Sequence, residues 1–304
     1  MVYVYVFAAA LAALILAARL APVRMLALGL ALERRISGLT LKSARVDGFD
    51  LPYLEGGKGE VLVLIHGFGG DKDNFTRIAR FLTPHYRVLI PDLPGFGDAT
   101  RRLDAGYGMD EQTDRISVFL GQLGLDRVYL GGNSMGGFIA SLYAARHPER
   151  VASLWLLDPA GTEASHSSVI LKHYEQTGDN PLLVKTVKLF DEVVRTTTHK
   201  APFLPRFART ALGLRAVADL ALHTRIMREM RDSPLLETRY HALATPALIV
   251  WGAEDQILSP AGAGAFGQLF PNSQVKVMQG IGHLPMAEAP RRAANDYLAY
   301  RNTI

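Results

Sequence analysis

The chain has 304 residues, of which 49% are hydrophobic and 20% charged, and its formal net charge is +4. These values fit one large α/β core that carries an extra apolar segment. The absence of cysteine excludes disulfides and thiolate metal sites, and the scattered histidines show no paired metal-ligand spacing. We therefore expect no metal and no cofactor.

The first 18 residues contain no charged side chain. A helix of this length spans about 27 Å, close to the ~30 Å hydrocarbon core of a bilayer. Tyr3 and Tyr5 suit one membrane interface, and Arg19 and Arg24 the other. The pattern predicts an uncleaved membrane anchor with a juxtamembrane helix over residues 1–35.

Two other readings of this segment stay open. A cleaved signal peptide, which would give a secreted or periplasmic protein, needs a basic residue ahead of the apolar stretch, and the first one here is Arg19. An interfacial helix is possible because Leu26 to Leu32 is also apolar. For the anchor, the positive-inside rule places the domain that follows it in the cytoplasm.

Basic residues gather after the apolar segment and again after residue 190. Next to a membrane they could contact anionic headgroups, each contributing about 1 kcal/mol. No nucleic-acid-binding module or aromatic stacking platform accompanies them, so nucleic acid is not an expected partner. The sequence does not indicate an oligomeric state.

Downstream of the anchor, strands and helices alternate. Leu39 to Val46 and Phe49 to Leu54 are predicted as paired strands around an Asp47-Gly48 turn. The expected elements that follow are a strand at 61–65, a helix from about Asn74 to Leu82, a strand at 86–90, a helix from Asp110 to Leu123, a strand at 127–131 and a helix at 135–146. This alternation predicts a mostly parallel sheet with helices on both faces.

A Gly-rich turn, His66 to Gly70, ends the apolar strand at 61–65. Such a turn can aim a backbone N–H into a site where negative charge develops on a carbonyl oxygen. We assign one donor for such an oxyanion to the N–H of Phe68 and the other to the N–H of Met135, the residue after Ser134. His66 is expected to brace the turn by hydrogen bonds.

Gly132-Asn133-Ser134-Met135-Gly136 lies between a predicted strand and a predicted helix. This is the setting of a nucleophile elbow, where a strained turn points the serine hydroxyl outward. Ser134 is therefore the candidate nucleophile. It needs a base within hydrogen-bond reach and an acid that orients the base.

The alternation stops between Asp158 and Thr245, where short apolar patches lie among Pro181, Pro202 and Pro205. We predict a helical lid at 161–242, inserted into a core formed by 36–160 and 243–304. Its apolar residues either pack the lid onto the core or line a groove for an acyl chain.

Two loops after later strands supply the partners of Ser134. Asp255 follows the apolar run 247–251, and His283 lies on a Gly-flanked loop after the strand 275–278. The chain order serine, acid, histidine then matches that of hydrolases with this elbow. Asp158 is the rival acid, because it follows the apolar run 154–157.

These motifs together resemble the α/β-hydrolase fold superfamily. The strings HGFGGDKDN at 66–74 and GNSMGG at 132–137, with the ending GHLPMAEAP at 282–290, are similar to bacterial family V lipases and to animal membrane-bound monoacylglycerol lipases. The resemblance covers about residues 40–300 and implies an ester hydrolase acting on acylglycerols. Haloalkane dehalogenases and epoxide hydrolases of this superfamily have aspartate at the elbow. This chain has Ser134 there, so we do not expect either of these two activities.

We therefore expect a serine esterase or lipase with the triad Ser134, His283 and Asp255, acting on an ester or lipid substrate. One alternative is a hydrolase of carbon–carbon bonds or of small non-lipid esters that uses the same triad. An alternative from another class is a hydrolase-fold binding protein without turnover.

Overall fold

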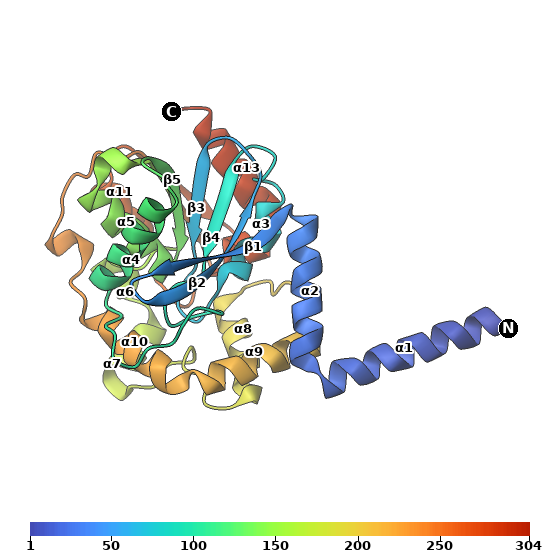
Figure 1. Ribbon diagram of the computed structural model, residues 1–304. Coiled ribbons are helices and arrows are strands. Elements are labelled where there is room, and N and C mark those ends of the chain that lie inside the picture. Colours follow the sequence, from blue (N-terminus) through green and yellow to red (C-terminus); the bar gives the residue numbers. More distant parts are fainter.

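The computed structural model describes residues 1–304, apart from the side chains of Val2 and residues 8–15. Its centre is an eight-stranded sheet in the order β1-β2-β4-β3-β5-β6-β7-β8 (Figure 1). The strands are β1 (Leu39–Val46), β2 (Phe49–Gly56), β3 (Val61–Ile65), β4 (Arg87–Pro91), β5 (Val128–Asn133), β6 (Val151–Leu157), β7 (Ala247–Gly252) and β8 (Ser273–Met278). β2 is antiparallel to both of its neighbours, β1 and β4. From β4 onward, the adjacent strands β4, β3, β5, β6, β7 and β8 are all parallel to one another. The predicted mostly parallel α/β sheet is confirmed.

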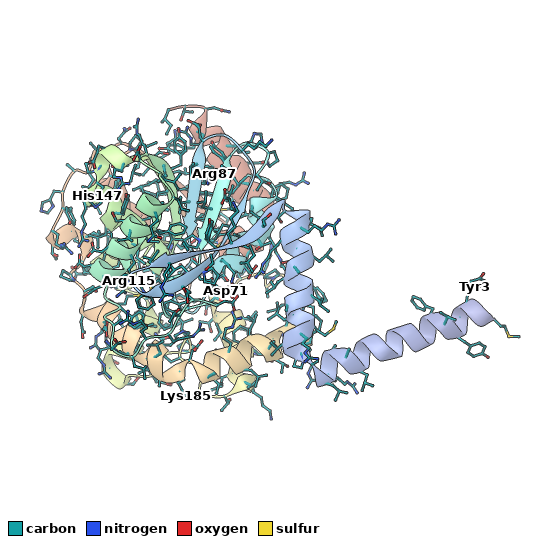
Figure 2. The ribbon with its side chains drawn as sticks, viewed as in Figure 1. Tyr3, Asp71, Arg87, Arg115, His147 and Lys185 are labelled. Atoms are coloured by element: carbon teal, nitrogen blue, oxygen red, sulfur yellow. The ribbon has the colours of Figure 1, made fainter. Side chains whose placement is uncertain are left out.

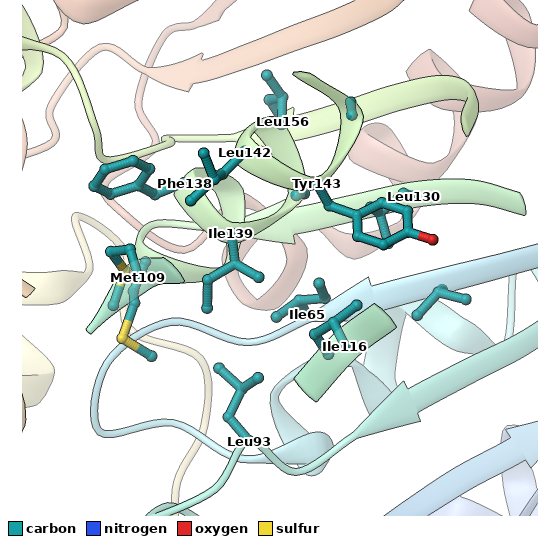
Figure 3. Close-up of a cluster of buried hydrophobic side chains, with 14 of the residues drawn as sticks. Ile65, Leu93, Met109, Ile116, Leu130, Phe138, Ile139, Leu142, Tyr143 and Leu156 are labelled. Atoms are coloured by element: carbon teal, nitrogen blue, oxygen red, sulfur yellow. The ribbon is translucent and has the colours of Figure 1, made fainter. Parts of the chain in front are cut away.

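Helices cover both faces of this sheet because its central strands are apolar on both sides. Along β3, Val63 and Ile65 belong to one buried cluster, and Leu62 and Leu64 to the other. The first cluster includes side chains of α4 (Met109–Gln122), α5 (Met135–Arg146) and α11 (Gly262–Leu269). The second includes α3 (Thr76–Ala79) and α13 (Pro290–Arg301). Figure 3 shows side chains of α5 packed over β3, β5 and β6.

The predicted helix from Asn74 to Leu82 is wrong in form. The chain makes a 3₁₀ turn, η1 (Lys72–Phe75), followed by the single turn of α3. Asp71 causes the tight start, because its carboxylate accepts a hydrogen bond from the N–H of Asp73 at 2.9 Å. A second 3₁₀ turn, η2 (Pro148–Arg150), links α5 to β6.

A group of short helices connects β6 to β7. They are α6 (Glu163–His166), α7 (Val169–Thr177), η3 (Val187–Leu189), α8 (Phe190–Thr197), α9 (Arg206–Ala218), α10 (Leu220–Asp232) and η4 (Leu236–Thr238). This group coincides with the position predicted for the lid, although the exact boundaries at 161 and 242 stay predictions. The remaining helix, α12 (Pro285–Glu288), follows the loop of His283.

Two helices precede the sheet. α1 (Val2–Leu20) projects away from the rest of the molecule, and Tyr3 near its far end is 90% exposed (Figures 1 and 2). α2 (Pro22–Ile36) instead packs against α9. Two hydrogen bonds of 2.7 and 2.5 Å from Arg34 to Asp73 join α2 to the core.

Half of the 18-residue apolar segment, Val2 and residues 8–15, has side chains outside the described part of the chain. Among the residues that the structure does describe, no helix has the length and apolar character needed to cross a bilayer. The anchor therefore stays a prediction.

Candidate active site

Ser134 occupies a strained turn between β5 and α5, with φ 55° and ψ −121°. The turn is possible because glycines stand two positions to either side. A Cβ at Gly132 would lie 2.2 Å from the carbonyl oxygen of Gly136, and one at Gly136 would lie 2.2 Å from that of Ile65. The backbone N–H of Ser134 donates to Leu157 O at 3.1 Å, which ties the turn to β6. The serine is thus held in a conformation that non-glycine residues rarely adopt.

The loop after β3 lies directly beside this serine. A Cβ added to Gly67 would lie 3.0 Å from the Cβ of Ser134, so a larger residue at this position would press against the serine. Phe68 follows it and lines the same pocket as Ser134. Met135 is the first residue of α5, where helical N–H groups have no intrahelical acceptor. Of the two predicted oxyanion donors, Met135 is therefore next to Ser134 in the chain, and Phe68 is near it in space.

His66 fixes the conformation of this loop. The N–H of Leu93 donates to its Nε2 at 2.9 Å, so the ring proton is on Nδ1 and is donated to Gly67 O at 2.8 Å. Burial lowers the pKa of His66 to about 4. At neutral pH the ring is therefore uncharged, as its acceptor role at Nε2 requires.

His283 and Asp255 form a buried hydrogen-bonded pair. Nδ1 of His283 is 2.7 Å from Oδ2 of Asp255. Oδ1 of Asp255 accepts from the N–H groups of Ile257 and Leu258 at 2.8 and 3.1 Å. These donors hold the carboxylate in place, and the carboxylate in turn holds the imidazole so that its Nε2 is available as a base.

Asp158, the rival acid, makes different contacts. It follows β6, with φ 45°, and its Oδ1 accepts from the N–H of Gly252 at 2.7 Å. Burial first, and then repulsion by Asp255, raises the pKa of Asp158 well above its ordinary value. Of the two acids that the sequence proposes, Asp255 is the one bonded to His283.

Asn133 connects the elbow to the histidine loop. Its side-chain amide donates at 3.0 Å to both Leu157 O and His283 O. The N–H of His283 donates to Thr197 O in α8, and Glu288 accepts from the N–H of Gly282 at 2.9 Å. The loop that carries His283 is thereby attached to the sheet, to the lid and to α12.

Lys72 lies just after the Gly-rich loop that follows β3. It is fully buried, and its Nζ lies 2.8 Å from Asp92 and 2.7 Å from Asp98. Asp98 and Asp71 also bind Arg215 of α9, at 2.8 and 3.0 Å. This charged network joins the loop after β3, the loop after β4 and α9.

A pocket of about 280 Å³ contains Ser134 and His283 in its wall. Lid side chains such as Val194 and Leu212 form another part of that wall. Leu26 and Leu30 of α2 complete it. The pocket is thus mostly apolar. Ser134, the candidate nucleophile, and His283, the candidate base, line it from the sheet side of the molecule.

Sequence reasoning missed three of these residues. Leu26 and Leu30 looked like part of a membrane-surface segment, and only tertiary packing reveals them in the pocket wall. Lys72 received no role in the sequence analysis beyond its place in the 66–74 motif. A signal was available for Lys72, because it lies next to the Gly-rich turn and two aspartates follow in the next loop.

Comparisons with known proteins agree with this architecture. A family model described as "alpha/beta hydrolase fold" matches residues 60–172 and 168–290. Lipase 1 of Psychrobacter immobilis is 38% identical over 281 residues, covering 90% of this chain and 87% of the relative. Monoacylglycerol lipase abhd6-A of Xenopus laevis is 30% identical, covering 86% of this chain and 82% of the relative.

A solved structure shows the same arrangement over nearly the whole chain. It is described as a membrane phospholipase A, a bacterial virulence factor, and has 37% sequence identity and a TM-score of 0.90. The match covers 99% of this chain and 98% of the other.

Proposed function

We propose, from the premise that this chain belongs to the α/β-hydrolase fold family, that it hydrolyses carboxylic esters through Ser134, His283 and Asp255. The observation that carries the proposal is the 2.7 Å hydrogen bond between His283 and Asp255, in a pocket shared with the strained Ser134. No cofactor takes part in the proposed reaction.

In the proposed cycle, Ser134 Oγ attacks the ester carbonyl while His283 accepts its proton. The N–H groups of Phe68 and Met135 stabilise the oxyanion of the tetrahedral intermediate. His283 then protonates the leaving alcohol, and an acyl-enzyme remains on Ser134. Water repeats the same steps and releases the acid, while Asp255 stabilises the imidazolium.

The proposed substrates are acylglycerols or related acyl lipids. The pocket wall is mostly apolar and includes leucines of α2 and valines and leucines of the 161–242 segment, and this suits an acyl chain better than a polar substrate. The relatives described as lipases and monoacylglycerol lipases support the same class.

The proposal includes membrane attachment through the N-terminal segment. On α1, the described side chains of Tyr3 and Phe7 are 90% and 71% exposed, and Arg19 follows at its end. An apolar surface of this kind is stable when covered by lipid. The solved relative described as a membrane phospholipase A supports this location, and a cytoplasmic catalytic domain stays a prediction.

Hydrolysis assays with p-nitrophenyl esters of increasing chain length, and with mono-, di- and triacylglycerols, test the function. We expect turnover of medium or long acyl chains, together with labelling by an active-site fluorophosphonate. Activity confined to acetate would favour small non-lipid esters as substrates. Complete absence of both turnover and labelling would favour a binding protein.

The α2 wall gives a more specific prediction. Leu30→Trp fills the part of the pocket beside α2, so kcat/KM for long-chain esters should fall by about tenfold or more, equivalent to about 1.4 kcal/mol. The p-nitrophenyl acetate rate should stay within about twofold.

Leu28→Trp is the matched control, since Leu28 lies on the same helix and is 65% exposed. It should leave both rates unchanged. Equal loss of long-chain activity in the two variants would remove α2 from the acyl-binding wall.

A further inference from the structure

A second carboxyl group lies behind the His283 and Asp255 pair. Asp158 and Asp255 follow the neighbouring parallel strands β6 and β7. One oxygen of each carboxyl group and one ring nitrogen of His283 all lie within 4.8 Å of one another, and all three side chains are buried. Two like charges so close together in a buried site strongly disfavour each other.

The hydrogen bonds distinguish the two carboxyl groups. Asp255 accepts two backbone N–H bonds at Oδ1 and the bond from His283 at Oδ2, so both of its oxygens have donors. Asp158 accepts one, from Gly252. Its other oxygen, Oδ2, is buried and has no donor among the described residues.

An ionised oxygen in that position would lack compensation for its lost hydration. A protonated oxygen carries no charge, and its O–H can donate a hydrogen bond to the neighbouring Asp255 carboxylate. The groups that face Asp158 are Asp255, His283 and, farther off, Glu288. Burial, Asp255 and Glu288 all raise the pKa of Asp158, in agreement with a protonated side chain.

We propose that Asp158 and Asp255 form a coupled pair that holds one proton and one negative charge behind His283, with the proton on Asp158. This inference rests on the proposed hydrolase function. Asp158 is then a positioning residue that supports Asp255 through a donated hydrogen bond. If Asp255 cannot carry the charge, Asp158 loses its repelling neighbour, ionises and takes over part of its role.

The first test is the pH profile of kcat/KM for Asp158→Asn. Asparagine has nearly the same shape, can still accept from Gly252 and can donate to Asp255. We expect kcat/KM within about threefold of wild type and an unchanged acid limb. If Asp158 carried a negative charge, its loss would destabilise the protonated imidazole and move the acid limb to lower pH by about one unit or more, which would overturn the proposal.

The second test compares Asp255→Asn with the double variant Asp158→Asn/Asp255→Asn. Removing a triad acid costs on the order of 10⁴-fold when no other carboxylate is available. With Asp158 present, we expect Asp255→Asn to lose only about 10²-fold, and the double variant to lose about 10⁴-fold. Equal losses in the two variants would show that the pair does not share its charge.

Controls separate this inference from the proposed function. Asp126→Asn, at an exposed aspartate before β5, should change neither the rate nor the pH profile. An active wild type with equal losses in the two variants refutes only the coupled pair, whereas an inactive wild type refutes the hydrolase. If Asp158→Asn does not fold, Asp158→Ser removes the ionisable group and keeps a hydrogen-bonding oxygen.

Discussion

Replacing Ser134 by alanine should lower kcat/KM for ester hydrolysis by about 10⁴-fold or more. The proposed mechanism has no other nucleophile, so the acyl-enzyme cannot form. Alanine has a Cβ like serine, and it therefore meets the same φ of 55° without a new clash. Thermal unfolding should change by only a small amount, and fluorophosphonate labelling should disappear.

Ser141→Ala is the control for this variant, because Ser141 lies two turns farther along α5 and is fully buried. It should keep nearly full activity and labelling. Near-wild-type turnover by Ser134→Ala would instead assign the nucleophile to another residue and end the proposed mechanism.

Lys72→Met should destabilise the folded protein by about 3–5 kcal/mol. Methionine has a similar length but no charge, so Asp92 would stay fully buried beside it without its ion-pair partner. Removing one member of a buried pair costs more than the pair itself contributes, because a desolvated charge is left behind. Denaturant unfolding of the purified variant measures this loss.

Lys185→Met provides the exposed counterpart. Lys185 lies on the lid surface (Figure 2), where it pairs with Asp179 at 2.6 Å and both side chains are 60% exposed. That pair contributes at most about 1 kcal/mol. Adding Asp92→Asn to Lys72→Met should recover part of the lost stability by removing the unpaired charge. A cost at Lys72 no larger than at Lys185 would contradict this account.

The sheet was predictable because its strands carry local signals. The apolar run 61–65, the turn at Asp47-Gly48 and the glycines around Ser134 each determine conformation through near neighbours. Asp255 and His283 could be proposed for the same reason, since each follows a recognisable strand. The family resemblance is confirmed by relatives that cover most of the chain.

Features that depend on long-range packing could not be predicted. The sequence predicts Asp255 as the acid but leaves Asp158 as a rival, because each follows an apolar run, and only the folded structure shows that Asp255 is bonded to His283. The burial of Lys72 depends on a loop 20 residues away. The position of Leu30 in the pocket depends on how α2 packs against α9.

α2 connects α1 to the sheet and also lines the pocket. This limits where the chain can be shortened to produce the protein without α1. A protein that begins at residue 21 would lack α1 alone and keep the α2 side chains in the pocket wall. Shortening it at the first strand, residue 39, would also delete Leu26, Leu30 and the Arg34 tie to Asp73. Such a product would lack the α2 part of its pocket wall, and acyl-chain preferences measured on it would not test the specificity proposed for the whole chain.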